Sequence, residues 1–148
     1  MASGPQTIIF LMQETRMGGI EYNSVALARA LKKSAVKVLF LCPHEGKLTE
    51  HLGKEGLEYL LYQRPKTFPI SLRVAGRTLF NPLAALYYLF VFPFIVFSVM
   101  RRLKKVEAKC VFTKGIYANL YGAIACRLTQ KKCIWDMQDC LLYTSDAA

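Results

Sequence analysis

The sequence predicts an α/β fold, a Rossmann-like parallel sheet with helices on both faces. Three observations predict it. Apolar runs of strand length alternate along the chain with segments that have helical spacing. The first two runs, residues 7–12 and 36–42, are apolar on nearly every residue, as in strands covered on both faces. The first run also leads through a short polar loop to two glycines that open a helix.

The first half of the chain predicts a βαβ unit followed by a further helix and strand. Ile20, Leu27 and Leu31 share one face of a helix. The strand-length run after this helix is apolar except for Lys37. The expected elements are strands at 7–12, 36–42 and 57–62 and helices at 20–33 and 47–52, the second closed by Gly53 or Gly56.

The second half predicts a loop and then a second alternation of helix and strand. Residues 63–81 contain Pro65, Pro69 and Gly76 among four basic residues, which predicts an irregular basic loop. Pro82 suits the first turn of a helix because its missing N–H needs no partner there. The remaining expected elements are a helix from Pro82, a strand at 110–113, a helix at 116–129 and a strand at 132–137.

Residues 140–148, CLLYTSDAA, have the pattern of neither a strand nor a helix. They resemble translated sequencing-adapter read-through. We therefore expect the natural chain to continue beyond Asp139. In this interpretation residues 1–139 are an incomplete N-terminal domain and 140–148 are a non-native tail.

The net charge of +10 raises the question of an anionic partner. The densest basic cluster, Arg101, Arg102, Lys104 and Lys105, directly follows a long apolar segment. This arrangement favours an anionic membrane surface over nucleic acid as the partner, with a solvated helix end as the alternative. We expect no nucleic-acid binding.

Cysteine and histidine positions indicate neither a metal nor secretion. The five cysteines form no C-x-x-C pair, and no charged-then-apolar leader precedes the first strand. His44 and His51 have no third ligand beside them and are interpreted as surface histidines. We expect no metal and no cofactor. The predicted location is the cytoplasm, with peripheral attachment to the inner face of the cell membrane as a further possibility.

An apolar segment of 23 uncharged residues lies between Arg77 and Arg101. Residues 83–100 are long enough to span a bilayer, but one crossing would place two strands of one sheet on opposite sides. Pro93 favours a bent segment at one leaflet. We expect Phe90, Phe94 and Phe97 to face acyl chains and the basic cluster to face headgroups. A core helix beneath another domain or partner is the alternative interpretation.

The Gly18-Gly19 pair predicts a ligand contact at the start of the first helix. Without a Cβ, the backbone can approach a ligand closely, and the next amides lack helical partners. A phosphate or a sugar hydroxyl suits such a place, although tight strand-to-helix turns also use glycine for geometry alone. Ligands of open parallel sheets bind beyond the carboxyl ends of the strands, where we expect one cleft lined by Gly18, Gly19, Lys114, Gly115 and Gln138.

The order and spacing of these motifs resemble the N-terminal domain of a family 4 glycosyltransferase, of the GT-B type. The similarity covers nearly all of residues 5–139. It includes Gly18-Gly19-x-Glu21, Leu27-Ala28-Arg29-Ala30-Leu31, Gly46-Lys47-Leu48, Gly56, Phe112-Thr113-Lys114-Gly115, and Ala118, Asn119, Tyr121 and Gly122.

The resemblance implies a retaining enzyme that moves a sugar from a nucleotide-sugar donor to a lipid-linked or polysaccharide acceptor. The donor would bind mainly to a second half that is absent from this chain. The chain would therefore be inactive alone. Gly18, Gly19 and Glu21 would lie at the donor phosphates or the transferred sugar, and Lys114 and Gly115 at the acceptor side. Lys114 could instead be a solvated loop lysine.

The last strand departs from the family pattern, in which a histidine often follows. Gln138 stands near that place, and glutamine can hydrogen-bond a sugar but does not titrate near neutral pH. Asp136 or Asp139 could supply a carboxylate, with a helix cap or turn as the alternative for either. We name Gln138 and Asp139 as the candidate catalytic residues.

Two other functions stay open. The chain could be a non-catalytic α/β domain that docks on a membrane or protein through its apolar helix and basic cluster. A dinucleotide-binding domain is disfavoured, because the Gly pair lacks G-x-G-x-x-G spacing. The second strand also ends in Cys42-Pro43-His44, without an acid for the ribose.

Overall fold

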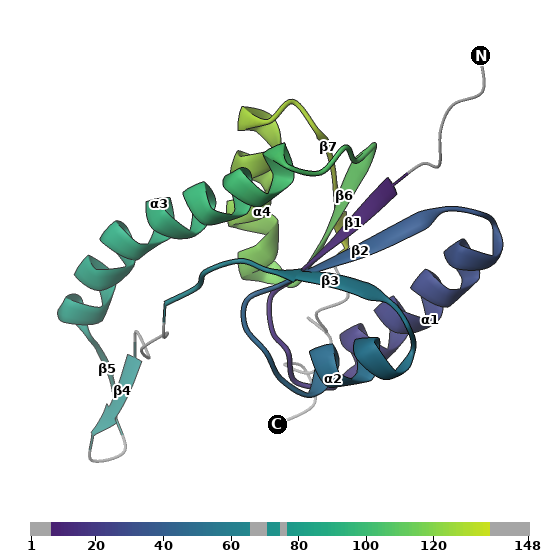
Figure 1. The fold of residues 1–148 in the computed structure, drawn as a ribbon. Helices are drawn as coiled ribbons and strands as arrows, with labels where there is room; N and C mark the ends of the chain where they lie inside the picture. The colour runs from purple at the N-terminus through teal and green to yellow at the C-terminus, as the bar shows by residue number, and fades with distance from the viewer. Residues whose placement is uncertain (1–6, 66–70, 75–76, 137–148) are drawn as a thin grey trace.

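The computed structural model describes residues 7–65, 71–74 and 77–136. It contains a five-stranded parallel sheet with the strand order β3-β2-β1-β6-β7 (Figure 1). The α/β Rossmann-like fold class is therefore confirmed. The strands of this sheet are β1 (Thr7–Met12), β2 (Lys37–Cys42), β3 (Glu58–Leu61), β6 (Cys110–Lys114) and β7 (Lys132–Asp136).

Helices cover both faces of the sheet. One face packs against α1 (Gly19–Lys33) and α2 (Lys47–Lys54), and the other against α3 (Pro82–Lys104) and α4 (Ile116–Leu128) (Figure 1). Alternate residues of β1 enter the two cores, because successive side chains of a strand point to opposite faces. Ile9 is buried with α3 and α4, whereas Phe10 is buried with α1 and α2. Residues 9–12 of β1 are therefore buried on both sides, as their apolar sequence predicted.

The strand order reverses beside β1. The chain adds β2 and β3 on one side of β1 and then crosses over to place β6 and β7 on the other side. β1 and β6 are direct parallel neighbours, with Phe10 opposite Phe112. A ligand crevice in such sheets opens at this reversal, outside the carboxyl ends of the two strands. The fold thus fixes where a site should be sought.

The segment expected to be an irregular basic loop contains two strands, so that prediction was wrong. β4 (Ser71–Val74) and β5 (Arg77–Phe80) pair in antiparallel register, with Ser71 opposite Phe80. Prolines and Gly76 were read as breakers over the whole segment, although the residues around them include β-branched and aromatic types that favour strands. Other boundaries differ by one or two residues. The helix expected at 47–52 reaches Lys54, and the strand expected at 57–62 is shorter at both ends.

Helix α3 divides into a packed part and an uncovered part. Its start is as expected, because Pro82 is the first residue and the Asn81 side chain accepts a hydrogen bond from the Ala84 amide at 3.2 Å. The helix continues through Pro93, and its C-terminal part buries Val99 and Leu103 completely. The N-terminal part extends away from the sheet (Figure 1) and exposes large apolar side chains, including Leu83, Leu89 and Phe90. The exposed part could meet lipid, another domain or a partner, so both interpretations of this segment stay predictions.

By length and composition, α3 could cross a membrane. The strands on either side of it argue against a single crossing, because β1 and β6 pair with each other in one sheet. The predicted tail, residues 140–148, lies outside the described residues.

Candidate functional site

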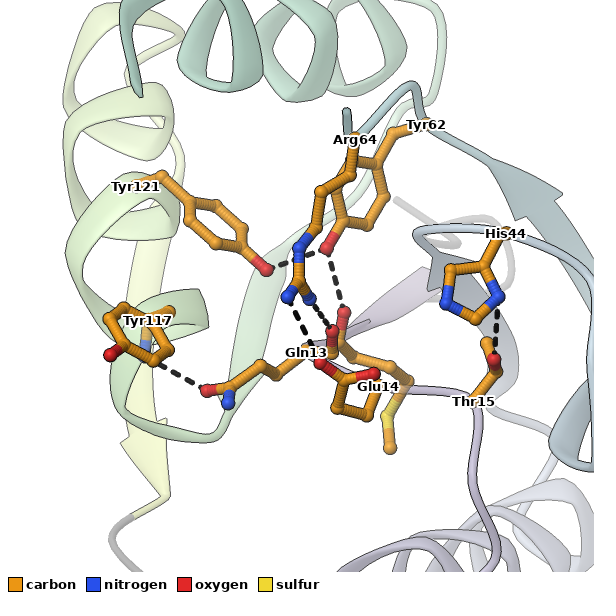
Figure 2. Close-up of polar contacts among 9 residues, drawn as sticks. Gln13, Glu14, Thr15, His44, Tyr62, Arg64, Tyr117 and Tyr121 are labelled. Atoms are coloured by element: carbon orange, nitrogen blue, oxygen red, sulfur yellow. Dashed lines mark hydrogen bonds and ion pairs between the residues drawn. The ribbon is translucent and has the colours of Figure 1, made fainter. Parts of the chain in front are cut away.

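The candidate site lies at the carboxyl ends of β1 and β6. The amide of Gln13 donates to the carbonyl oxygen of Lys114 at 3.1 Å, which joins the residue after β1 to the last residue of β6. The Gln13 side chain then accepts a hydrogen bond from the Tyr117 amide, in the first turn of α4, at 2.9 Å (Figure 2). Gln13 therefore connects the loop before α1 to the start of α4.

Gly115 makes this arrangement possible. Its backbone has φ +104° and ψ 153°, a region populated almost only by glycine. A Cβ added here would lie 2.5 Å from Oε1 of Gln13. The glycine predicted from sequence as a ligand contact is thus also required by the protein itself, because it leaves room for the Gln13 side chain.

Arg64, which follows β3, reaches across to the loop after β1. Its guanidinium donates to the Gln13 carbonyl oxygen and forms an ion pair with Glu14 at 2.9 Å (Figure 2). Only 10% of the Arg64 side chain is exposed. Burial acts to lower the pKa of Arg64, but the Glu14 carboxylate and the hydroxyls of Tyr121 and Tyr62 together outweigh it, and the pKa is raised. Arg64 therefore stays charged and holds the loop in place.

Two buried tyrosines support the site from the α3 and α4 side. The Tyr62 hydroxyl donates to the carbonyl oxygen of Met12 at 3.0 Å and lies 2.6 Å from the hydroxyl of Tyr121 (Figure 2). Burial raises the pKa of Tyr121 to about 12 and raises the pKa of Tyr62 well above its usual range. Both hydroxyls therefore remain protonated donors at neutral pH.

We expect the tyrosine pair to make stability fall at alkaline pH. An unfolded tyrosine ionises near pH 10, whereas the folded pair binds its protons to higher pH. Between these values the unfolded state carries fewer protons, so the free energy of unfolding falls as pH rises, by on the order of 1 kcal/mol per pH unit for each group. Urea unfolding at pH 8, 10 and 11 measures the fall. The fall in the free energy of unfolding should be smaller in Tyr62→Phe and unchanged in the control Tyr22→Phe, whose side chain is exposed. Equal falls in the two variants would show that the tyrosine pair is not its cause.

His44 was interpreted as a surface histidine, and it is exposed. It nevertheless has a defined partner, because its Nδ1 lies 2.8 Å from Oγ1 of Thr15 (Figure 2). The Thr15 carbonyl oxygen accepts from the Leu48 amide in the first turn of α2 at 3.0 Å. The loop after β1 is thereby tied to α2 as well as to α4. Within residues 7–65, 71–74 and 77–136, no three His, Cys, Asp or Glu side chains group as a metal site.

Of the predicted site residues at the start of α1, one stabilises the helix and another is exposed to solvent. Glu21 accepts a hydrogen bond from the Gly18 amide at 3.0 Å, so its carboxylate caps the helix. Gly19 is the first residue of α1 and is exposed, with open space where a Cβ would stand. Gly19 is therefore the residue of this group with room for a ligand beside it.

Lys114 is neither a solvated loop lysine nor an open cation. It is the last residue of β6, only 2% exposed, and its ammonium pairs with the carboxylate of Asp136. The ammonium also lies 5.3 Å from the centre of the Phe10 ring, a cation–π contact. Asp136 is the last residue of β7, so it lies in a strand and not at the helix cap given as the alternative. Its register partner is Lys114, which explains the pair.

Gln138 and Asp139, named as catalytic candidates, lie outside the described residues. Gly19 and Gly115 follow neighbouring strands at the same edge, while the place of Gln138 beside them stays a prediction. Sequence reasoning missed Gln13, Arg64 and the pairing of Tyr62 with Tyr121, although Tyr121 belongs to the pattern that resembles the glycosyltransferases. A signal existed for Gln13, which directly follows the first strand.

Comparison with solved structures shows the fold of GT-B glycosyltransferases. MurG of Acinetobacter baumannii is similar at a TM-score of 0.63 and 22% identity, over 88% of this chain and 34% of that one. Anabaena HepE, solved with UDP and glucose, is similar at a TM-score of 0.61 and 15% identity, over 88% of this chain and 29% of that one. The described sheet is a Rossmann-like domain of this kind. The chain therefore spans about a third of the length of these glycosyltransferases.

The fold alone does not decide the function. The C-terminal domain of a Pyrococcus furiosus hydrogenase is also similar, at a TM-score of 0.58 and 15% identity over 89% of this chain and 91% of that one. No protein-family model and no curated protein sequence matches this chain. Function must therefore be argued from the site.

Proposed function

We propose that this chain is the acceptor-side domain of a retaining, family 4 glycosyltransferase and is inactive alone. The enzyme would transfer a sugar from a nucleotide-sugar donor to a lipid-linked or polysaccharide acceptor. The observation that carries the proposal is the position of Gly19 and Gly115 at the strand reversal, on loops held by Gln13 and Arg64. HepE, which shares the fold, was solved with UDP-glucose.

The proposal gives each side chain a role suited to its place. Gly18 and Gly19 would lie against the donor phosphates or the transferred sugar. Gln138 and Asp139 would follow β7 toward the same crevice and contact the sugar. Lys114 is occupied by Asp136 and would stabilise the edge rather than bind the acceptor. Glu21 would act through its cap on Gly18.

A transfer assay tests the proposal. The reading frame should be extended beyond Asp139 to its own stop codon, and the purified product incubated with nucleotide sugars and candidate acceptors. We expect acceptor-dependent release of the nucleotide, and none from the 148-residue chain alone. An extended protein that contains no second Rossmann-like half and releases no nucleotide would contradict the proposal and favour the docking domain.

We also propose that the protein is cytoplasmic and binds the membrane peripherally through α3. Phe90, at 72% exposed, and the neighbouring Leu89 are uncovered on the part of α3 that extends from the sheet. Arg101, Arg102, Lys104 and Lys105 in its last turn and at its end would meet anionic headgroups. Apolar insertion and charge act together here, and each basic residue near the surface adds about 1 kcal/mol.

Vesicle co-sedimentation measures this attachment. Binding should require anionic lipid, weaken as salt rises, and weaken further in Phe90→Glu, because a charge cannot enter the acyl region without cost. Ile124→Glu is the matched control, since Ile124 is an exposed apolar residue on α4 instead. Equal recovery in the supernatant with and without anionic vesicles, from folded protein, would leave α3 as a surface for protein contact.

A further inference from the structure

A groove follows α3 where this helix passes the ends of β2 and β3. Its larger hollow, about 580 Å³, is lined by His44, Arg64, Phe94 and Arg102 among others. A second hollow of about 290 Å³ shares Phe94 and Arg102 with the first and continues along the helix to Lys105. Because both hollows are lined by Phe94 and Arg102, they adjoin along α3, and we call the two together the groove.

One face of α3 supplies most of the second hollow. The contributing residues recur at spacings of three and four, which places them on one stripe of the helix. The stripe begins with apolar rings and ends with cations. Its members are Phe94, Phe97, Ser98, Arg101, Arg102 and Lys105. Ser98 accepts a hydrogen bond from the Gln63 amide at 2.8 Å, which fixes the segment after β3 against the middle of the stripe.

Apart from Arg64, which pairs with Glu14, the arginine and lysine side chains of the groove have no ion-pair partner among the described residues. Within the described part of the chain, no carboxylate forms an ion pair with Arg101, Arg102 or Lys105. Glu45 is the one acidic residue that lines either hollow in that part. Phe94 and Phe97 leave about half of their surfaces open, at 46% and 56% exposed. The groove therefore offers cations beside uncovered aromatic surface.

The groove is continuous with the candidate site through Arg64. This residue lines the larger hollow, and its guanidinium contacts the Gln13 carbonyl oxygen. A group bound beside Arg64 and Arg102 would thus lie next to the loop after β1. Arginine suits phosphate because its planar fork of donors matches the phosphate oxygens.

We propose that this groove binds a phosphate ester that carries an apolar chain, with the phosphate at Arg102 and the chain along Phe94 and Phe97. The inference rests on the proposed function and makes it more specific: the acceptor would be a phosphorylated lipid-like molecule rather than a neutral polysaccharide. The cations would hold the phosphate, and the part of the acceptor beyond it would reach the Gln13 loop.

Calorimetric titration of the 148-residue chain with a soluble mimic tests the groove without any sugar transfer. Hexyl phosphate should bind at one site, about tenfold more tightly than inorganic phosphate. The reason is that a few methylene groups of its chain are removed from water when they pack against the aromatic rings. Hexanol should bind more weakly than hexyl phosphate. Equal affinity for inorganic and hexyl phosphate would overturn the apolar part of the proposal.

Two matched pairs on α3 locate the site. Arg102→Ala should weaken hexyl phosphate binding about tenfold through loss of a charge-assisted bond. Lys104→Ala removes the same charge from the same helix but lines neither hollow, so its effect should stay below about twofold. Phe94→Ala should likewise weaken binding more than Phe90→Ala does. Equal losses within either pair, in variants with unchanged melting temperatures, would overturn the groove.

Comparing hexyl phosphate in solution with phosphate headgroups in a bilayer distinguishes a soluble ligand from a membrane surface. Vesicles containing phosphatidylglycerol that bind the chain while hexyl phosphate does not would show that the cations serve a membrane surface, and the groove inference would be wrong. Hexyl phosphate binding with no sugar transfer by the extended protein would refute the proposed function but leave the groove. Sugar transfer to a neutral acceptor, without hexyl phosphate binding, would support the proposed function and refute the groove.

Discussion

Replacing Asp136 by alanine should destabilise the protein by about 3 kcal/mol, among the largest losses expected for a single substitution at this edge. The change leaves the Lys114 ammonium without its carboxylate in a place where the lysine side chain is 1% exposed. An unpaired buried charge is costly because neither water nor a counter-ion solvates it. We give the low end of the range for a broken buried pair because the Asp136 side chain is 22% exposed.

Urea unfolding at neutral pH measures this loss, and a double variant isolates its cause. Lys114→Met combined with Asp136→Leu removes both charges and should recover most of the stability, since apolar pairs often replace buried ion pairs without cost. If Asp136→Ala changes the unfolding free energy by less than about 1 kcal/mol, Lys114 is not a buried partner and could face a ligand after all.

Gly115→Ala should cost about 2–4 kcal/mol, the second large effect. A residue with a Cβ is strained at φ +104°, and the added atom would meet Oε1 and Cβ of Gln13 at 2.5 and 2.9 Å. The Gln13 side chain would have to leave the Tyr117 amide, which opens the site as well as weakening the fold.

Gly19→Ala is the matched control, because both glycines were predicted from sequence as ligand contacts. Gly19 has open space at the Cβ position and no positive φ, so alanine should be neutral or stabilise by up to about 1 kcal/mol. The melting temperatures of the two variants, compared with that of the unchanged protein, measure this difference in stability. A neutral Gly115→Ala would mean that Gln13 does not occupy the position described here.

The strands of the large sheet were predictable because burial on both faces leaves a strong signal. Phe10 and Ile9 lie in opposite cores, so the sequence shows an unbroken apolar run. The paired strands β4 and β5 were missed because they are short, with Gly76 and prolines nearby. The glycine and prolines therefore predicted a loop more strongly than the short apolar stretches predicted strands.

The site was predictable only where a residue is defined by its position after a strand. Gly19 and Gly115 follow that rule, and the strand order places both at the reversal. The pairing of Lys114 with Asp136 depends on the register of β6 against β7, and Arg64 reaches Glu14 across 50 residues. Contacts of that kind depend on the tertiary arrangement and leave no local pattern in the sequence.

In the proposed function, a glycosyl-transfer site lies beside Gly19 at the carboxyl edge of the sheet. Gly19 and Gly53 both have open space where a Cβ would stand, so a side chain can start at either position without a clash at its Cβ. Gly53 lies near the end of α2, away from the start of that helix at the loop after β1. In the extended protein, Gly19→Leu should lower kcat/KM for the nucleotide sugar about tenfold or more, while Gly53→Leu changes it less than about twofold. Unchanged kcat/KM in a folded Gly19→Leu variant would contradict a transfer site beside Gly19.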